Sequence, residues 1–230
     1  MKCKYCLLLL PLFLSLSALT AAQSFYYYCD FEHPNDTTGW RFDKNKISTD
    51  KSSFVIGKAI HRIGARSLYV SSDGGATAGY TSSANGYSIV AYRKFTLSAG
   101  LYDLAFDLRI VGDGRSDNDV LRVAYFPTTR ADGTAQLPPT AAMGQLFPKL
   151  VTDNPFIDNY RRQVFSGMSW NKIQGTLNIP QDGDYYLAFY FKENGGVIRL
   201  STLVLVLIMF KLLLSKPLTI APLSLPMSLL

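Results

Sequence analysis

The chain has few of the residues on which enzyme catalysis usually depends. Its two histidines, His33 and His61, are too far apart in sequence for metal-ligand spacing. It has two glutamates, Glu32 and Glu193, whereas glycoside hydrolysis needs two carboxyl groups facing each other across a cleft. Past residue 22 it also lacks a Gly-x-Ser-x-Gly elbow, a His-Glu-x-x-His helix, a glycine-rich phosphate loop and a Cys-x-x-Cys pair. We therefore predict no catalytic residue.

The first residues have the composition of a secretory signal peptide. Lys2 and Lys4 precede an apolar run over residues 7–19, and the small residues 20–22 follow it. This run is shorter than the roughly 20 apolar residues that a membrane-spanning helix needs. We predict cleavage after Ala22 and a protein that is secreted or displayed at the cell surface.

Cysteine is scarce as well. Cys3 and Cys6 lie in the segment that we expect to be removed, so Cys29 is the single cysteine left and no internal disulfide can form. Cys29 lies in a run of strand-forming residues, 25–31. We predict that it is a small buried hydrophobe rather than a nucleophile or an intermolecular bridge.

Neither sign of charge dominates residues 23–196. The whole chain has 23 Lys/Arg and 17 Asp/Glu, but two of these cations lie in the signal peptide and three in the tail, which leaves 18 cations against 17 anions and a net charge of +1. We therefore expect no nucleic-acid partner. The length suits one domain, 23–196, and we expect a monomer.

Apolar and polar residues alternate along several segments, as half-buried strands require. In residues 101–110, for example, Tyr102, Leu104 and Phe106 share one face and Asp103 and Asp107 the other. The predicted strands are 25–31, 53–56, 67–72, 88–97, 101–110, 119–126, 172–179 and 184–191. Clusters of Gly, Asn, Asp and Ser separate them. We predict an all-β antiparallel β-sandwich of eight or nine strands, a jelly roll of the concanavalin-like or MAM-like kind, with its last strand missing or altered.

Two groups of residues are candidates for ligand contact. The long connection 127–169 contains Phe156, Tyr160 and Arg161, and long loops in compact domains often carry function; the alternative is ordinary loop variability. Sugar binding uses aromatic faces with a few directed polar groups. The further candidates by residue type are Trp40, Tyr80, Tyr87 and Trp170. The alternative is that the tryptophans pack in the core or along its edge.

Several short motifs follow one another along residues 30–196. They are Asp30-Phe-Glu32, Gly39-Trp40, Phe54-Val-Ile-Gly57, Ser67-Leu-Tyr-Val-Ser-Ser-Asp-Gly-Gly75, Ala91-Tyr-Arg93, Gly100-Leu-Tyr-Asp-Leu-Ala-Phe-Asp107, Asp119-Val-Leu-Arg-Val123 and Gly183-Asp-Tyr-Tyr-Leu-Ala-Phe189. In these motifs the chain resembles the bacterial choice-of-anchor J and cleaved-adhesin surface domains. The resemblance implies a non-catalytic jelly-roll module associated with adhesion and carbohydrate binding.

The resemblance also implies a structural calcium ion near the first strand. Calcium takes six to eight hard oxygen ligands, many of them from carboxylates. Asp30 and Glu32 alternate onto one face and Asp73 lies in a turn after a neighbouring strand, so these three are the candidate ligands. The alternative is that they are solvated or cap a sheet edge.

The tail, residues 197–230, departs from the family pattern. It has no acidic residue and is rich in leucine, serine and proline. One hypothesis is a shift of the reading frame near Gly196. A second is a membrane anchor, although Lys211 and Lys216 interrupt the apolar run. A third is a genuine last strand over residues 197–208.

Together these patterns predict a secreted module that binds a carbohydrate or a host or matrix protein. Two alternatives stay open: a glycan-acting hydrolase whose aspartates are brought together by the fold, and a passive spacer from a larger truncated adhesin.

Overall fold

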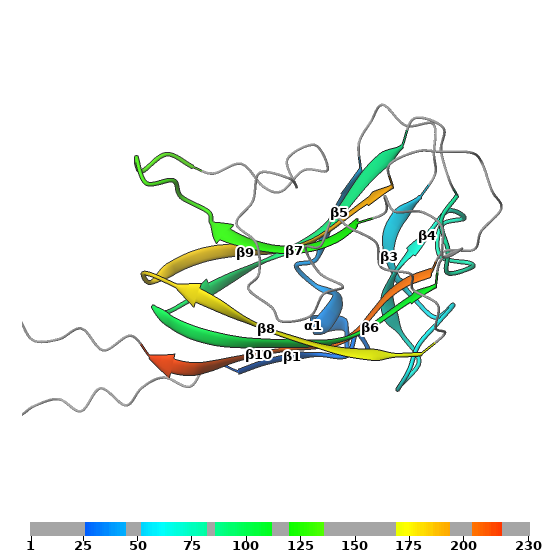
Figure 1. The fold of residues 1–230 in the computed structure, drawn as a ribbon, viewed down its shortest axis with the longest axis horizontal. Helices are drawn as coiled ribbons and strands as arrows, with labels where there is room; N and C mark the ends of the chain where they lie inside the picture. Colours follow the sequence, from blue (N-terminus) through cyan, green and yellow to red (C-terminus); the bar gives the residue numbers. More distant parts are fainter. Residues whose placement is uncertain are drawn as a thin grey trace, which may run out of the picture.

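The protein is an antiparallel β-sandwich (Figure 1). The computed structural model describes residues 26–44, 52–81, 86–111, 120–135, 169–193 and 204–217. Its elements are β1 (Tyr26–Cys29), α1 (Pro34–Thr37), β2 (Arg41–Lys44), β3 (Ser53–Gly57), β4 (Ser67–Ser71), β5 (Tyr87–Leu97), β6 (Gly100–Val111), β7 (Val120–Pro127), β8 (Asn171–Ile179), β9 (Gly183–Glu193) and β10 (Val204–Pro217). The predicted signal peptide lies outside the described residues.

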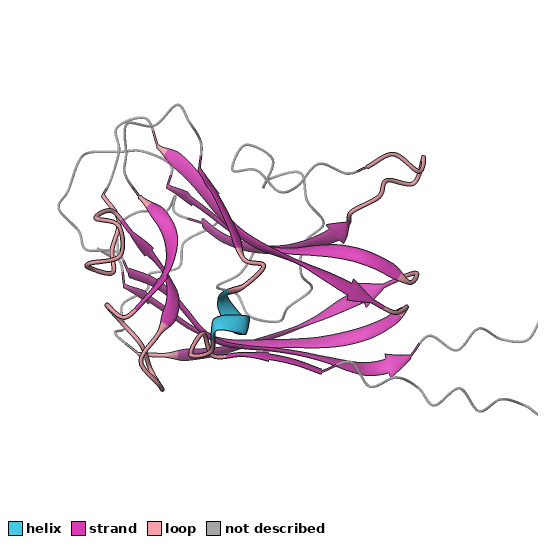
Figure 2. Ribbon diagram, turned by 180° about the vertical axis from the view of Figure 1, so that it is seen from behind, coloured by secondary structure: helices cyan, strands magenta, loops and turns pink. Residues whose placement is uncertain are grey.

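The strands form two sheets that face each other (Figure 2). Sheet A has the order β3-β4-β10-β6-β8, with β1 also paired to β10; sheet B has the order β2-β5-β9-β7. Every one of these pairs is antiparallel. The predicted all-β jelly-roll class is confirmed, and each of the eight predicted runs overlaps a strand.

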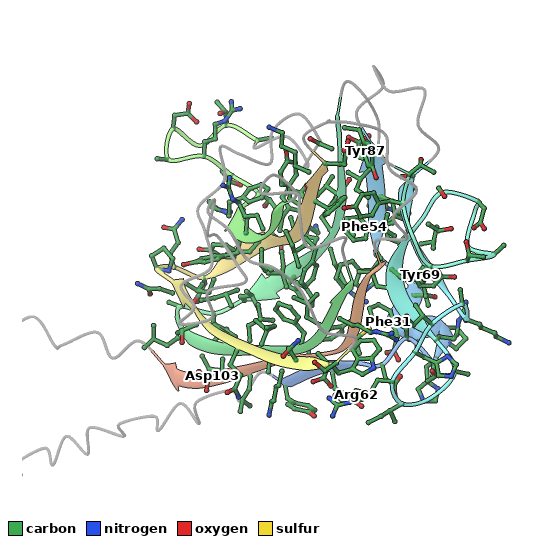
Figure 3. The ribbon with its side chains drawn as sticks, turned by 45° about the vertical axis from the view of Figure 1, so that its right-hand side comes forward. Phe31, Phe54, Arg62, Tyr69, Tyr87 and Asp103 are labelled. Atoms are coloured by element: carbon green, nitrogen blue, oxygen red, sulfur yellow. The ribbon has the colours of Figure 1, made fainter. Side chains whose placement is uncertain are left out.

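The main core fills the space between the sheets. Alternate residues of facing strands supply it, so that Leu104 and Phe106 of β6 meet Leu187 and Phe189 of β9. Phe106 and Phe189 make an edge-to-face contact with ring centroids 5.4 Å apart. Figure 3 labels Phe54 among the side chains between the layers. Cys29 is fully buried here, as its neighbours in sequence predicted.

Arg93 ties the two sheets together near β1. Its Nη1 donates a hydrogen bond to Tyr27 Oη over 2.7 Å and another to the Asp36 carbonyl over 3.1 Å. The guanidinium also lies 4.8 Å from the centroid of the Tyr27 ring. Since Arg93 belongs to β5 of sheet B and Tyr27 to β1 of sheet A, this contact joins the layers.

The backbone of residues 204–217 lies inside sheet A as β10. It pairs with β6 from Val204 opposite Val111 to Pro217 opposite Gly100, with two irregularities on the way. Its other side pairs with β4 and then with β1. The boundary at residue 196 and a frame shift there stay predictions. No helix within the described ranges is long and apolar enough to cross a membrane.

Candidate functional site

The outer face of sheet B carries a second apolar cluster, separate from the core. Along β5, β7 and β9 one set of alternate residues enters the core, so the other set points outward. The outward set forms a cluster of its own. Its buried members are Val90, Ala124, Phe126, Ala188 and Tyr190, and Tyr92 and Tyr186 pack against them partly exposed. Sheet B therefore has apolar residues on both sides.

The strand register arranges these aromatic rings in a row. Tyr186 of β9 is opposite Lys94 of β5 and Phe126 of β7, and Tyr92 is opposite Ala188. The Tyr92 and Tyr186 centroids are 5.7 Å apart with their planes at 88°, and those of Tyr186 and Phe126 are 5.5 Å apart. The row thus crosses three strands.

The end of this face where β5 finishes and β9 begins is open to solvent, whereas its centre is buried. Arg41, Lys94 and Thr96 are exposed around the two half-buried tyrosines. We use the name Tyr92 patch for the following residues: Arg41, Tyr92, Lys94, Thr96, Asp184 and Tyr186. It combines aromatic rings with hydrogen-bonding groups at an accessible edge.

Asp184 is held in its ionised form by two neighbours from β5. Thr96 Oγ1 donates a hydrogen bond to Asp184 Oδ1 over 2.6 Å, and Lys94 Nζ lies 2.9 Å from Asp184 Oδ2. The hydrogen bond from Thr96, followed by that from Lys94, holds the pKa of Asp184 below its ordinary value. The hydrogen bond to Asp184 raises the pKa of Lys94. A carboxyl group of this kind does not act as a general acid at neutral pH.

The phenol of Tyr92 stays protonated at neutral pH. Burial raises the pKa of Tyr92, the neighbouring Tyr186 raises it further, and the charge of Arg41 opposes the rise. A neutral phenol can both donate and accept a hydrogen bond. Tyr92 therefore offers a ligand an aromatic ring and a hydroxyl group.

Three of the aromatic residues singled out from the sequence lie in the core. Trp40, Tyr80 and Tyr87 are each at most 5% exposed. The Trp40 ring packs between those of Phe31 and Phe189, with centroids 6.0 Å from each. These positions match the alternative in which such residues pack inside the sandwich.

Trp170 lies on the opposite side of the molecule from the Tyr92 patch. It packs, half-buried, against Tyr69 on the outer face of sheet A. The guanidinium carbon of Arg109 is 5.9 Å from the centroid of its indole ring. The remaining candidates, Phe156, Tyr160 and Arg161, lie outside the described residues.

The candidate calcium ligands each accept hydrogen bonds within a different loop. Asp30 Oδ1 accepts a hydrogen bond from the Glu32 amide over 3.0 Å. Glu32 Oε1 accepts from the Ala65 and Arg66 amides, both over 2.7 Å, and Asp73 accepts from Ser71 and Thr77. The described part of the chain brings no three His, Cys, Asp or Glu residues into one metal-binding group.

Sequence reasoning missed Asp36 as a neighbour of Asp30. Burial raises the pKa of Asp36, and a hydrogen bond with the Asp30 carboxyl group raises it further. Two carboxyl groups therefore lie side by side after β1. A calcium site at Asp30, Glu32 and Asp73 stays a prediction.

The outer face of sheet B was also missed, although the sequence contains a signal for it. In residues 184–191 the aromatic residues occupy both alternate sets, with Tyr185 and Phe189 in one and Tyr186 and Tyr190 in the other. A strand with a solvated outer face carries polar residues in one of these sets. Aromatic residues on both faces therefore predict that much of this outer face is buried, as it is.

No family model and no curated protein matches the chain. Several solved structures resemble it at low identity. The CBM22-1 xylan-binding domain from Paenibacillus barcinonensis is 12% identical with a TM-score of 0.46, over 82% of this chain and 93% of that one. The cleaved adhesin domain of Lys-gingipain from Porphyromonas gingivalis is 13% identical with a TM-score of 0.41, over 82% and 96%. A xylan-binding module, CBM15, is 11% identical with a TM-score of 0.38, over 85% and 99%. Membership of the choice-of-anchor J family stays a prediction.

Proposed function

We propose that the protein binds glycans at the Tyr92 patch without transforming them. The observation that carries this proposal is the pair of half-buried tyrosines, Tyr92 and Tyr186, at the open margin of a sheet face whose centre is apolar. Sugar rings stack their C–H faces on aromatic rings, and a few fixed polar groups select the orientation.

The polar groups at the patch are positioned before a ligand arrives. Lys94 and Thr96 both contact Asp184, so three side chains from two strands share one network. Preorganised groups lower the entropic cost of binding. A rigid sheet with a fixed polar rim favours recognition of a hydroxyl-rich ligand.

Removing the rings of the patch tests the proposal. Tyr92→Ala and Tyr186→Ala should each weaken glycan binding by about tenfold, since a ring contact is worth about 1–1.5 kcal/mol beyond its burial. The matched controls are Tyr26→Ala and Tyr28→Ala, which remove exposed tyrosines from β1 of the other sheet. Binding is measured with a glycan array and then by titration calorimetry on the glycans retained.

Two outcomes would overturn the proposal. One is a protein that retains no glycan from the array while it binds host or matrix proteins. The other is release of reducing sugar from the retained glycans, which would place the protein among hydrolases. Equal losses of glycan affinity in the patch variants and the β1 controls would show that the Tyr92 patch is not the binding site.

We also propose that the protein acts outside the cytoplasm. The basis is the charged, apolar and small-residue order of residues 2–22. N-terminal sequencing of the protein made by cells should start at Gln23. A mature chain that starts at Met1 would contradict cleavage.

A further inference from the structure

We propose that the ligand is an anionic glycan that carries carboxylate or sulfate groups, and that Arg41 and Lys192 bind them. This inference rests on the proposed function, because it names the class of glycan that the outer face of sheet B takes. It starts from the charges of that face.

Cations outnumber anions among the side chains that point outward from sheet B. Alternation along the strands places four cations there and two anions. The cations are Arg41, Lys94, Arg122 and Lys192, and the anions are Asp43 and Asp184. The excess of positive charge is therefore local, because residues 23–196 together carry a net charge of +1.

The side chains of the two anions already have partners within the protein, whereas in the described ranges those of two cations have no hydrogen-bond or ion-pair partner. Asp184 contacts Lys94 and Thr96, and Asp43 and Arg122 have interactions of their own. The side chains of Arg41 and Lys192, by contrast, form no hydrogen bond or ion pair with any residue in the described ranges. Among the described residues, the charge left available to a ligand is thus positive.

On the outer face of sheet A, the described charged side chains of β6 and β8 balance. They are Asp103, Asp107, Arg109 and Lys172, two of each sign. Arg62 reaches across to Asp107, with 2.8 Å between Nη1 and Oδ1. Figure 3 shows Arg62 and Asp103 on the outer side of this sheet.

The strand register sets the separation of Arg41 and Lys192. Arg41 is opposite Tyr92, and Lys192 is opposite Ser88. Four residues along β5 span about 13 Å and two strand spacings about 10 Å, so the Cα atoms of Arg41 and Lys192 lie about 16 Å apart. Val90 lies midway between them and is fully buried, so the two cations stand at separate margins of this face and bind separate charged groups of a ligand.

The experiment compares charge variants on anionic and neutral glycans. Arg41→Gln and Lys192→Gln should each weaken binding to polygalacturonate or heparin by about fivefold in low salt, the size of one solvent-exposed charge contact. The matched controls are Lys58→Gln and Lys172→Gln, which remove exposed cations elsewhere. Added salt should weaken glycan binding by the wild-type protein. It should also reduce the difference in affinity between the wild-type protein and the variants.

The glycan panel separates the two sources of negative charge. Polygalacturonate presents carboxylates, heparin presents both groups, and dextran sulfate presents sulfates, while xylan and galactan fragments of matched length serve as neutral ligands.

The outcomes keep this inference apart from the proposed function. Binding of neutral glycans that depends on Tyr92 but not on Arg41 and Lys192 would overturn the inference and leave the proposed function standing. Equal losses of affinity in the control variants would show that anionic glycans are attracted by the overall charge and not by these two residues, which would overturn the inference too. Failure to bind any glycan would overturn both.

Discussion

Glu32 shows how one carboxylate can hold a loop of many residues. Its Oε1 accepts hydrogen bonds from two successive amides, those of Ala65 and Arg66, and so fixes the loop between β3 and β4. Gly64, with φ of 75°, leaves the room that the carboxylate needs, because a Cβ there would collide with it. A side chain predicted as a calcium ligand thus has a structural partner in the protein itself.

We expect Glu32→Ala to lower the free energy of unfolding by about 1–2 kcal/mol, because the exposed Ala65 amide and the partly buried Arg66 amide lose their acceptor. Glu32→Gln keeps a carbonyl oxygen and should lose less than half as much. Urea unfolding measures both. Asp103→Ala, at an exposed site on β6, should change little; equal losses for Glu32→Ala and Glu32→Gln would mean that the charge matters and the acceptor does not.

The calcium ion that the family resemblance implies near the first strand should involve the carboxyl group of Asp30. Calcium would then raise the melting temperature by mass action relative to protein in chelator, by several degrees at a saturating concentration. Asp30→Asn should abolish that increase and Asp103→Asn should preserve it. Melting curves that coincide with and without chelator would contradict the site.

At the scale of elements, Asp73 organises the turn that follows β4. Its Oδ1 accepts from Ser71 Oγ over 2.7 Å and its Oδ2 from Thr77 Oγ1 over 2.6 Å. Led by the Thr77 hydroxyl, these hydrogen bonds hold the pKa of Asp73 well below its ordinary range. A lowered carboxyl pKa stabilises the fold above the unfolded-state value of about 3.9, and this stabilisation is lost as the pH falls further.

Thr77→Val should therefore raise the pKa of Asp73 toward its ordinary value, as carboxyl-carbon NMR titration can measure. The free energy of unfolding of the wild-type protein should fall as the pH is lowered below about 4. In Thr77→Val this fall should be smaller. Thr134→Val, which removes the equivalent partner of Asp132, is the matched control and should leave the Asp73 titration unchanged. An unchanged Asp73 titration in Thr77→Val would contradict this account.

Most elements could be predicted from alternation, because a half-buried strand repeats every two residues. β2 (Arg41–Lys44) was not predicted, because four residues with one apolar side chain show no alternation of apolar and polar residues. The Tyr92 patch could not be predicted for another reason. Its residues come from three strands, and strand register, not their spacing in the sequence, brings them close together. Trp40 was proposed by residue type, whereas its burial follows from the packing of Phe31 and Phe189 around it.

At the scale of the whole molecule, sheet A depends on β10. A chain that ends at residue 203 would leave β6 unpaired along one side and remove the partner of β1. We expect this variant to lose its cooperative unfolding transition, because exposed strand edges and an open core replace the paired sheet. A chain that ends at residue 217 is the control and should melt like the full chain. Equal cooperativity in the two shortened chains would show that the sandwich does not need β10.

The place of β10 also sets an order of events during folding. β4 and β6 are neighbours of the same strand, yet that strand is the last of the described strands along the chain. Such contacts between distant parts of the sequence slow folding to milliseconds or seconds. Until residues 204–217 have been made, β1, β4 and β6 expose unpaired backbone to other chains, so the unfinished protein is the form most in need of a chaperone.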